Sequence, residues 1–208
     1  MMPNVIGQDA PDLPRRLLEA LETGQTIVFP TDTVFGIGGN PWDETVLNRV
    51  RTLKKRPIDR PFTLHLPSVD AVERYAVLDE RLRVAVSRLL PGPYTLLLPA
   101  APAAPPSSVL AGILGVRVPK HQFFDISLAA LDRPLFGTSV NRSGAPPLVD
   151  VDEIIERFSG VDLIIVGPVG SSPSSILDLT QDPLRVLRGS PPKDFPAAGL
   201  AQEEEGDA

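Results

Sequence analysis

Several stretches of the chain carry apolar residues at helical spacing, and each begins near a residue that can cap a helix. Leucines three or four residues apart follow Asp12 and predict a helix over residues 12–22, which ends at Gly24. A second apolar stripe follows Asp43 and predicts another helix. By the same reasoning, further helices are predicted after Ser68, after Asp79, over residues 122–131 and from Asp150 or Asp152 to Phe158.

Short apolar runs between these helices predict strands. Residues 26–29 predict a buried strand that ends at Pro30, because proline cannot donate to a central ladder. Residues 62–66 alternate strictly, so Thr63 and His65 should lie on the face turned away from the core. Other strands are predicted at residues 95–98, 115–119, 135–138, 162–166, 176–179 and 184–187. Because helices and strands are intermixed, we expect an α/β fold of the mixed α+β kind, with helices covering a mixed sheet.

The composition is typical of one globular domain followed by a tail. The chain has 208 residues, of which 42% are hydrophobic and 22% charged, which is enough to bury a core. We expect the domain to span residues 1–189. Residues 190–208 turn to Pro and Ala and then to three consecutive glutamates, which predicts a disordered acidic tail. Residues 99–108 are rich in Ala, Pro and Ser and predict a mobile surface loop.

The sequence lacks cysteine and shows no leader or membrane signal. Without cysteine there is no disulfide, no thiol nucleophile and no thiolate metal site. The first residues have no apolar core of the signal-peptide kind, and no apolar run approaches the roughly 18 residues that a membrane span needs. We therefore expect a soluble, cytoplasmic protein.

The candidate chemistry begins just after the first long strand. Thr31, Asp32 and Thr33 precede a glycine-rich segment at residues 36–39, which predicts a turn where the backbone approaches something closely. One helix later, residues 49–60 hold six basic residues and one acid, a local charge of +5 in a chain whose net charge is −6. A basic cluster in an acidic protein favours a local anion site over a general polyanion-binding surface.

Each of these features also has a purely structural explanation. A Pro-Thr-Asp turn followed by glycines is often only a turn, and basic residues at a helix end are often a solvated cap. The Ser-x-Asn-x-Ser-Gly segment at residues 139–144 is typical of Asx and Ser turns. The sequence has no P-loop, no Rossmann glycine spacing, no zinc-ligand spacing and no Gly-x-Ser-x-Gly. The residues alone predict an anion-binding protein with a cationic pocket and hydroxyl-rich loops.

Taken together, these segments resemble the YrdC-like family, the L-threonylcarbamoyladenylate synthases. The resemblance rests on Pro-Thr-Asp-Thr-Val-Phe-Gly-Ile-Gly at residues 30–38, and on residues 54–57, 91–95, 115–119, 139–144, 174–178 and 186–189. The segments follow the family's order over residues 10–190. The resemblance implies a twisted mixed parallel and antiparallel sheet, with flanking helices, around a cationic cavity. It also implies the short form of the family, without an extra C-terminal domain.

The activity that this resemblance implies is the synthesis of threonylcarbamoyl-AMP from L-threonine, bicarbonate and ATP, with release of pyrophosphate. The product would pass to a tRNA threonylcarbamoyl transferase, while direct binding of tRNA is left open. Mg²⁺ would arrive with ATP and would need no protein metal site. Fixed cations suit this chemistry, because a carbamate, a carboxylate and a triphosphate must be brought together.

Residue by residue, the resemblance assigns three groups. The catalytic residues would be Lys54, Arg56, Ser139 and Asn141. The ATP-binding residues would be Arg56, Arg60, Ser139, Pro147 and Arg188. The threonine-binding residues would be Thr33, His65, Arg117, Gly137 and Ser174.

Two other functions stay open at this point: a non-catalytic paralogue that binds nucleotide or RNA, and a related enzyme that handles carbamoyl-adenylate. The intact Lys54-x-Arg56 and Ser139-x-Asn141 pairs favour catalysis. Arg60 stands where many family members have Asn, and Phe35 replaces a common Tyr, so nucleotide use is the property most affected by departures from the pattern.

Overall fold

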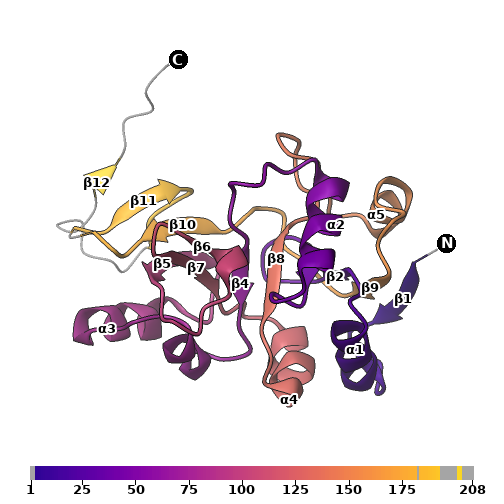
Figure 1. Ribbon diagram of the computed structural model, residues 1–208, viewed down its shortest axis with the longest axis horizontal. Helices are drawn as coiled ribbons and strands as arrows, with labels where there is room; N and C mark the ends of the chain where they lie inside the picture. The colour runs from indigo at the N-terminus through magenta and orange to yellow at the C-terminus, as the bar shows by residue number, and fades with distance from the viewer. Residues whose placement is uncertain (1–2, 182, 193–200, 203–208) are drawn as a thin grey trace.

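The computed structural model describes residues 3–181, 183–192 and 201–202, and its strands form one mixed sheet. The strands are β1 Asn4–Gly7, β2 Ile27–Phe29, β3 Gly36–Gly39, β4 Thr63–His65, β5 Tyr94–Pro99, β6 Val109–Leu110, β7 Ile113–Arg117, β8 Leu135–Ser139, β9 Leu163–Val166, β10 Ser175–Asp178, β11 Arg185–Arg188 and β12 Ala201–Gln202. Their order is β1-β9-β2-β3-β8-β4-β7-β5-β10-β11-β12, with β6 beside β7 (Figure 1).

The sheet contains both parallel and antiparallel pairs. The pairs β1·β9, β2·β9, β4·β7, β5·β10 and β11·β12 are parallel. The pairs β2·β3, β3·β8, β4·β8, β5·β7, β6·β7 and β10·β11 are antiparallel. The predicted mixed sheet is therefore confirmed.

All of the α-helices in the described residues except α4 begin directly after a predicted capping residue. They are α1 Leu13–Glu22, α2 Glu44–Lys54, α3 Glu80–Leu89, α4 Ala129–Leu131 and α5 Val151–Arg157. The carboxylate of Asp43 accepts hydrogen bonds from the first turn of α2, Asp79 caps α3 and Asp150 caps α5. The helix predicted after Ser68 is a 3₁₀ turn, Asp70–Arg74, and another lies at Pro106–Ser108. The segment Phe123–Leu128 is a π-helical turn that runs into α4.

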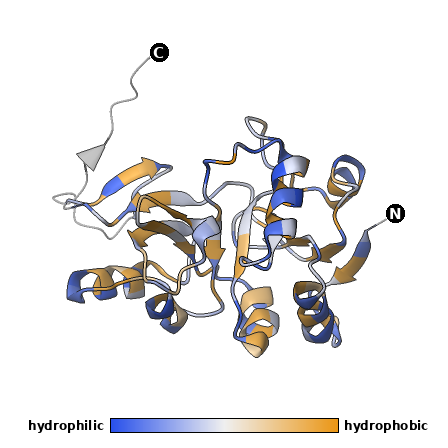
Figure 2. Ribbon diagram, in the orientation of Figure 1, coloured by the Kyte–Doolittle hydropathy of each residue, from blue (hydrophilic) through white to orange (hydrophobic). Residues whose placement is uncertain are grey.

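Three apolar clusters hold these elements on the sheet. The side chains of α1 and of the π-helical turn pack on Ile27 and Phe29 of β2, whereas those of α2 and α5 pack on Val28, which points to the opposite face. The side chains of α3 pack on β4, β5, β7 and β10. Figure 2 shows hydrophilic and hydrophobic residues side by side on α2 and α3, as expected for helices with one buried face.

The glycine-rich segment is a buried strand, and the prediction of a turn there is wrong. β3 pairs with both β2 and β8 near the middle of the sheet, and the turn lies before it. The strands approach so closely that a Cβ built on Gly38 would lie 1.7 Å from the carbonyl oxygen of Phe136. The glycines are therefore needed for strand packing in the sheet.

Two segments that the sequence predicts to be a mobile loop and a disordered tail form hydrogen bonds with other parts of the fold. In the 99–108 loop, Ser107 accepts from the backbone N–H of Phe62 and its hydroxyl donates to Pro41. Most of the predicted tail lies outside the described residues, and within it Ala201–Gln202 pairs with β11. Across the described part of the chain, no helix is long and apolar enough to cross a membrane.

Candidate functional site

The principal cavity lies on the face of β4, β5, β7 and β10 that is turned away from α3. Leu64, Leu96, Leu114 and Val116 point toward α3, so the residues between them point to the other face. Those residues form the floor of a cavity of about 500 Å³: Thr63, His65, Thr95, Leu97, Ile113, Gly115, Arg117 and Ile176. The volume is in the range of small-molecule sites. The predicted orientation of Thr63 and His65 is confirmed.

This cavity brings together almost all of the residues that the resemblance selects. Its lining includes Thr33, Lys54, Arg56, Arg60, His65, Arg117, Gly137, Ser139, Asn141, Ser174 and Arg188. Pro147 does not line it. The loop after β8 folds back on its own base, because the N–H of Leu148 donates to Val140 (2.7 Å), and Leu148 packs beside the apolar cluster under α5. The expectation that Pro147 binds ATP therefore stays a prediction.

Lys54 joins the end of α2 to the loop after β8. Its side chain is buried, at 1% exposure, and its ammonium donates to the carbonyl oxygens of Ser139 and Asn141 and to Asn141 Oδ1 (3.1 Å). Ser139 Oγ donates to the same Oδ1 (2.5 Å). Burial and the charge of Arg56 lower the pKa of Lys54 to about 7. Lys54 and the Ser-x-Asn pair are thus parts of one hydrogen-bonded network.

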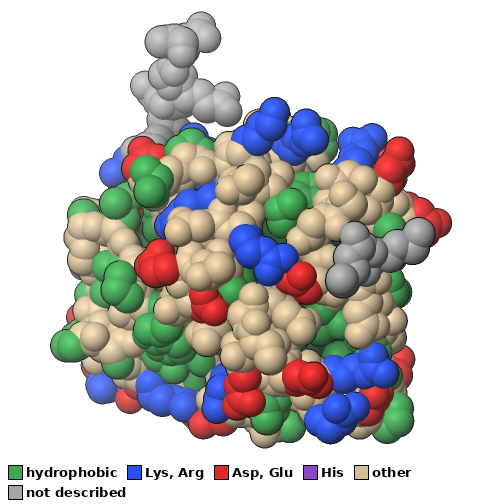
Figure 3. Space-filling view, turned by 45° about the vertical axis from the view of Figure 1, so that its right-hand side comes forward, with side chains coloured by type: hydrophobic (Ala, Val, Ile, Leu, Met, Phe, Trp, Pro, Cys, Tyr) green, Lys and Arg blue, Asp and Glu red, His purple; other side chains and the backbone are tan. Residues whose placement is uncertain are grey.

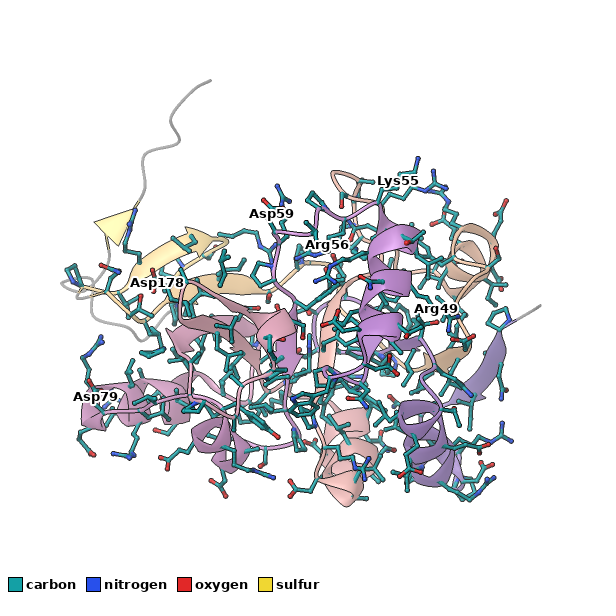
Figure 4. The ribbon with its side chains drawn as sticks, viewed as in Figure 1. Arg49, Lys55, Arg56, Asp59, Asp79 and Asp178 are labelled. Atoms are coloured by element: carbon teal, nitrogen blue, oxygen red, sulfur yellow. The ribbon has the colours of Figure 1, made fainter. Side chains whose placement is uncertain are left out.

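Arg56 lies against an aromatic ring. Its guanidinium carbon is 5.2 Å from the centre of the Phe62 ring, and Nη2 donates to the carbonyl oxygen of Pro61 (2.7 Å). Burial, with the charges of Arg60 and Arg51, lowers the pKa of Arg56. In Figure 4 Arg56 lies inside the segment that follows α2, whereas Lys55 and Asp59 lie at its outer edge.

Arg117 sits at the other end of the cavity in a buried ion pair. Its Nη2 is 2.6 Å from Asp32 Oδ1, and the two side chains are 7% and 12% exposed. Its Nη1 donates to Thr33 Oγ1 (2.8 Å). Burial lowers the pKa of Arg117 to about 10, Asp32 opposes that shift and Arg188 adds to it. The guanidinium is therefore charged at neutral pH.

His65 is a neutral imidazole beside Arg117. Burial, and then the charge of Arg117, lower the pKa of His65 to about 3. Its Nδ1 lies 3.2 Å from the carbonyl oxygen of Thr63, which can only accept, so Nδ1 carries the proton and Nε2 is an acceptor. Gly137 leaves room for the ring, because a Cβ there would lie 2.8 Å from His65 Cε1 and 2.8 Å from Phe29 Cζ.

Ser174 and Arg188 complete the wall on the β10 side. Arg188 donates through Nε (3.2 Å) and Nη2 (2.9 Å) to the carbonyl oxygen of Ser174, and the Ser174 hydroxyl is 2.8 Å from that of Thr95. Burial lowers the pKa of Arg188. Arg188 therefore has backbone and hydroxyl partners and no carboxylate partner among the residues that the structure describes.

The charges around the cavity are unevenly compensated. Five basic residues line it (Lys54, Arg56, Arg60, Arg117 and Arg188), and the described lining residues include no carboxylate. Asp32 reaches Arg117 from behind the lining, and within the described ranges no ion pair joins an acid to any of the other four. On the outer face drawn in Figure 3, basic and acidic side chains are intermixed. The described lining of the cavity therefore carries an excess of positive charge.

The apolar part of the lining and the partner of Arg117 were missed by reasoning from sequence. Leu97, Ile113 and Ile176 form an apolar wall beside the cations. Strand alternation at these positions contained the signal, since each lies next to a residue of the α3 cluster. Asp32 carried no such signal, because its partner is 85 residues away in the chain.

A family model described as "Telomere recombination", built for the Sua5, YciO and YrdC proteins, matches residues 19–190. The chain belongs to this family. The threonylcarbamoyl-AMP synthase of Pyrococcus abyssi is 34% identical to it over 176 residues, which are 81% of this chain and 51% of that protein. The threonylcarbamoyl-AMP synthase of Shigella boydii serotype 4 is 33% identical over 168 residues, 77% of this chain and 88% of that protein.

The fold agrees with the family. The chain superposes on the crystal structure of Pyrococcus abyssi Sua5 complexed with L-threonine with a TM-score of 0.78 and 29% identity, covering 90% of this chain and 57% of that one. This chain thus spans about half the length of the archaeal relative and most of the length of the bacterial one. The family resemblance seen in the sequence segments is confirmed.

Proposed function

We propose that this protein makes threonylcarbamoyl-AMP from L-threonine, bicarbonate and ATP, with release of pyrophosphate. One observation carries the proposal: a single cavity has one end where Arg117 is neutralised by Asp32, with Arg188 nearby, and another where Lys54, Arg56 and Arg60 have no carboxylate partner among the described residues. The first end suits a zwitterion and the second suits a triphosphate. The names of the family members above support the same activity.

L-Threonine would occupy the end around Arg117 and His65. The Arg117 guanidinium would bind the threonine carboxylate, since its Nε is buried without a hydrogen-bond partner among the described residues. The bare Nε2 of His65 would accept a hydrogen bond from the threonine hydroxyl or amine. Thr33, Gly137 and Ser174 would shape the rest of this subsite.

ATP would occupy the other end, with its phosphates among the uncompensated cations and its base near the apolar wall of Ile113 and Ile176. Because the described lining includes no carboxylate, Mg²⁺ would enter on the phosphates as part of the nucleotide substrate. Arg56 and Arg188 would neutralise the charge that develops on the α-phosphate and pyrophosphate. Ser139 and Asn141, held by Lys54, would orient the α-phosphate.

The reaction then needs little covalent chemistry from the protein. The threonine amine attacks the carbon of bicarbonate and water leaves, which forms the carbamate. A carbamate oxygen attacks the α-phosphorus, and pyrophosphate departs with its electron pair, which leaves the mixed anhydride with AMP. Holding the reactants at the junction of the two ends supplies most of the acceleration. The product would pass to a tRNA threonylcarbamoyl transferase in the cytoplasm.

Pyrophosphate release from ATP tests the proposal when threonine or bicarbonate is omitted in turn. We expect release only when both are present, with threonylcarbamoyl-AMP detected by mass spectrometry. Release with carbamoyl phosphate in place of threonine and bicarbonate would point to a carbamoyl-adenylate enzyme. Threonine and nucleotide binding with no release under any condition would point to a non-catalytic binder.

A further inference from the structure

Asp32 lies in the turn after β2 and is held from two sides. Its Oδ1 accepts from Arg117 Nη2 (2.6 Å), and its Oδ2 accepts from the backbone N–H of Lys120 (3.2 Å), just beyond the end of β7. Asp32 is absent from the lining of the principal cavity and instead lines a second cavity of about 800 Å³, which shares Thr33 and Pro173 with the first. The carboxylate therefore acts on the first cavity through Arg117.

Arg117, Thr33 and Thr31 form a chain of hydrogen bonds in which each donor and acceptor can be assigned. The Thr31 hydroxyl donates to the carbonyl oxygen of Val34 (2.7 Å), which cannot donate. In the contact between the two hydroxyls (2.9 Å), Thr33 is then the donor and Thr31 the acceptor. Thr33 Oγ1 in turn accepts from Arg117 Nη1. The Thr33 hydroxyl proton thus points to Thr31, and the guanidinium of Arg117 is held against an acceptor lone pair of the Thr33 oxygen.

Asp32 also compensates a charge that has no other carboxylate partner in the described part of the chain. Arg117 is 6% exposed, and Arg188 is close enough to disfavour its charged form. A buried guanidinium without a counter-ion would turn toward whatever acceptors it can reach. The carboxylate of Asp32 therefore holds the Arg117 guanidinium in one position in the cavity wall.

We infer that Asp32 is a positioning residue for the amino-acid substrate, because it holds Arg117, whose Nε–H has no partner among the described residues, in the wall of the substrate cavity and in its hydrogen bond to Thr33. This inference rests on the proposed threonine subsite. It assigns Asp32 no contact with threonine or ATP.

Equilibrium binding of L-threonine to Asp32→Ala and Asp32→Asn tests the inference by calorimetry. We expect Asp32→Ala to weaken threonine binding by about tenfold or more, because the charged hydrogen bond to Arg117 is lost. Asp32→Asn should fall between wild type and Asp32→Ala, since its amide oxygen can still accept from Arg117 but its NH₂ group opposes the N–H of Lys120. In turnover assays KM for threonine should rise in the same order, with kcat at saturating threonine within about threefold of wild type.

Asp162→Asn is the matched control, because Asp162 forms an arginine ion pair with Arg49 (2.8 Å) outside the cavity. It should lower thermal stability and leave threonine affinity unchanged. Threonine binding within twofold of wild type, or tighter, in folded Asp32→Asn would overturn the inference even if Asp32→Ala does not fold. So would an equal loss of threonine and ATP affinity. Wild-type protein that binds no threonine would instead overturn the proposed function.

Discussion

The two ends of the cavity use the same residue type in different electrostatic settings. At one end Arg117 is paired with Asp32 and bonded to Thr33, with Arg188 nearby. At the other, Arg56 has an aromatic ring and a backbone oxygen as partners and no carboxylate among the described residues. A paired arginine recognises shape and direction, whereas an unpaired one retains its charge for a bound anion.

This difference explains how one small chamber can sort two substrates. A triphosphate gains most where positive charge is uncompensated, and a zwitterion gains little there. Pairing Arg117 with Asp32 reduces the attraction of the threonine end for phosphate and keeps a directional donor for a carboxylate. The predictions below test each end separately, beginning with the largest expected effect.

Among the substitutions considered, replacing Arg56, at the end without carboxylate partners, should lower turnover most. We expect Arg56→Ala to lower turnover about a thousandfold or more, since a cation beside the transferred phosphoryl group is lost. Arg51→Ala is the control, because its guanidinium carbon lies 5.2 Å from the same Phe62 ring but Arg51 does not line the cavity. Pyrophosphate release and thermal melting measure both. An unfolded Arg56→Ala, or equal inactivity of Arg51→Ala, would contradict the assignment.

Lys54→Met tests whether this end depends on a positioned loop. The change removes the ammonium that donates to two carbonyl oxygens and to Asn141 Oδ1, which keeps only its bond from Ser139 Oγ. We expect turnover to fall about a hundredfold through misplacement of Ser139 and Asn141, with a loss of stability of about 1–3 kcal/mol. Lys55→Met removes the same charge from an exposed neighbour and should have little effect on either quantity. Similar losses of turnover in both variants would mean that activity depends on the net charge of this region and not on the hydrogen bonds of Lys54.

Gly137→Ala tests the packing of the threonine end. Its Cβ would meet His65 and Phe29 at 2.8 Å, so we expect a loss of about 1–3 kcal/mol in the free energy of unfolding. Gly115→Ala is the control in the same cavity floor, because its Cβ would meet nothing closer than 3.6 Å. Chemical denaturation measures both. Equal stability of the two variants would show that the ring has room to move.

The pH dependence of stability tests whether His65 is held neutral. Its pKa is about 3 in the folded protein against an ordinary 6.5, so the unfolded chain binds the proton more readily between these values. Stability should therefore fall as pH drops below 6.5. Between pH 7 and pH 5 we expect wild type to lose about 2 kcal/mol more than His65→Gln, in which this titration is absent. Parallel stability curves for the two proteins would contradict a neutral, buried His65.

Local signals in the sequence predicted well those features that depend on neighbours in the chain. Asp43, Asp79 and Asp150 cap helices because a carboxylate reaches N–H groups only two or three residues ahead. Alternation placed Thr63 and His65 on the cavity face because the pleat of a strand allows no other arrangement. The family segments then predicted which distant residues meet.

Features that depend on pairing across the sheet were not predictable in this way. Glycines at residues 36–39 suit a turn as well as a strand, and only the close approach of Phe136 distinguishes the two. In the same way, the hydrogen bond from Leu148 to Val140, which closes the loop that carries Pro147, has no local signal in the sequence. Both outcomes depend on tertiary contacts.

The sequence by itself determined the elements of this protein, the alternating faces of its strands and its membership of a family, since these follow from local spacing and from residue types in order. Only the tertiary structure decided which of the cavity's basic side chains has a carboxylate partner. Asp32 and Arg117 are 85 residues apart, as are Lys54 and Ser139, and their partners are chosen by the order of strands in the sheet.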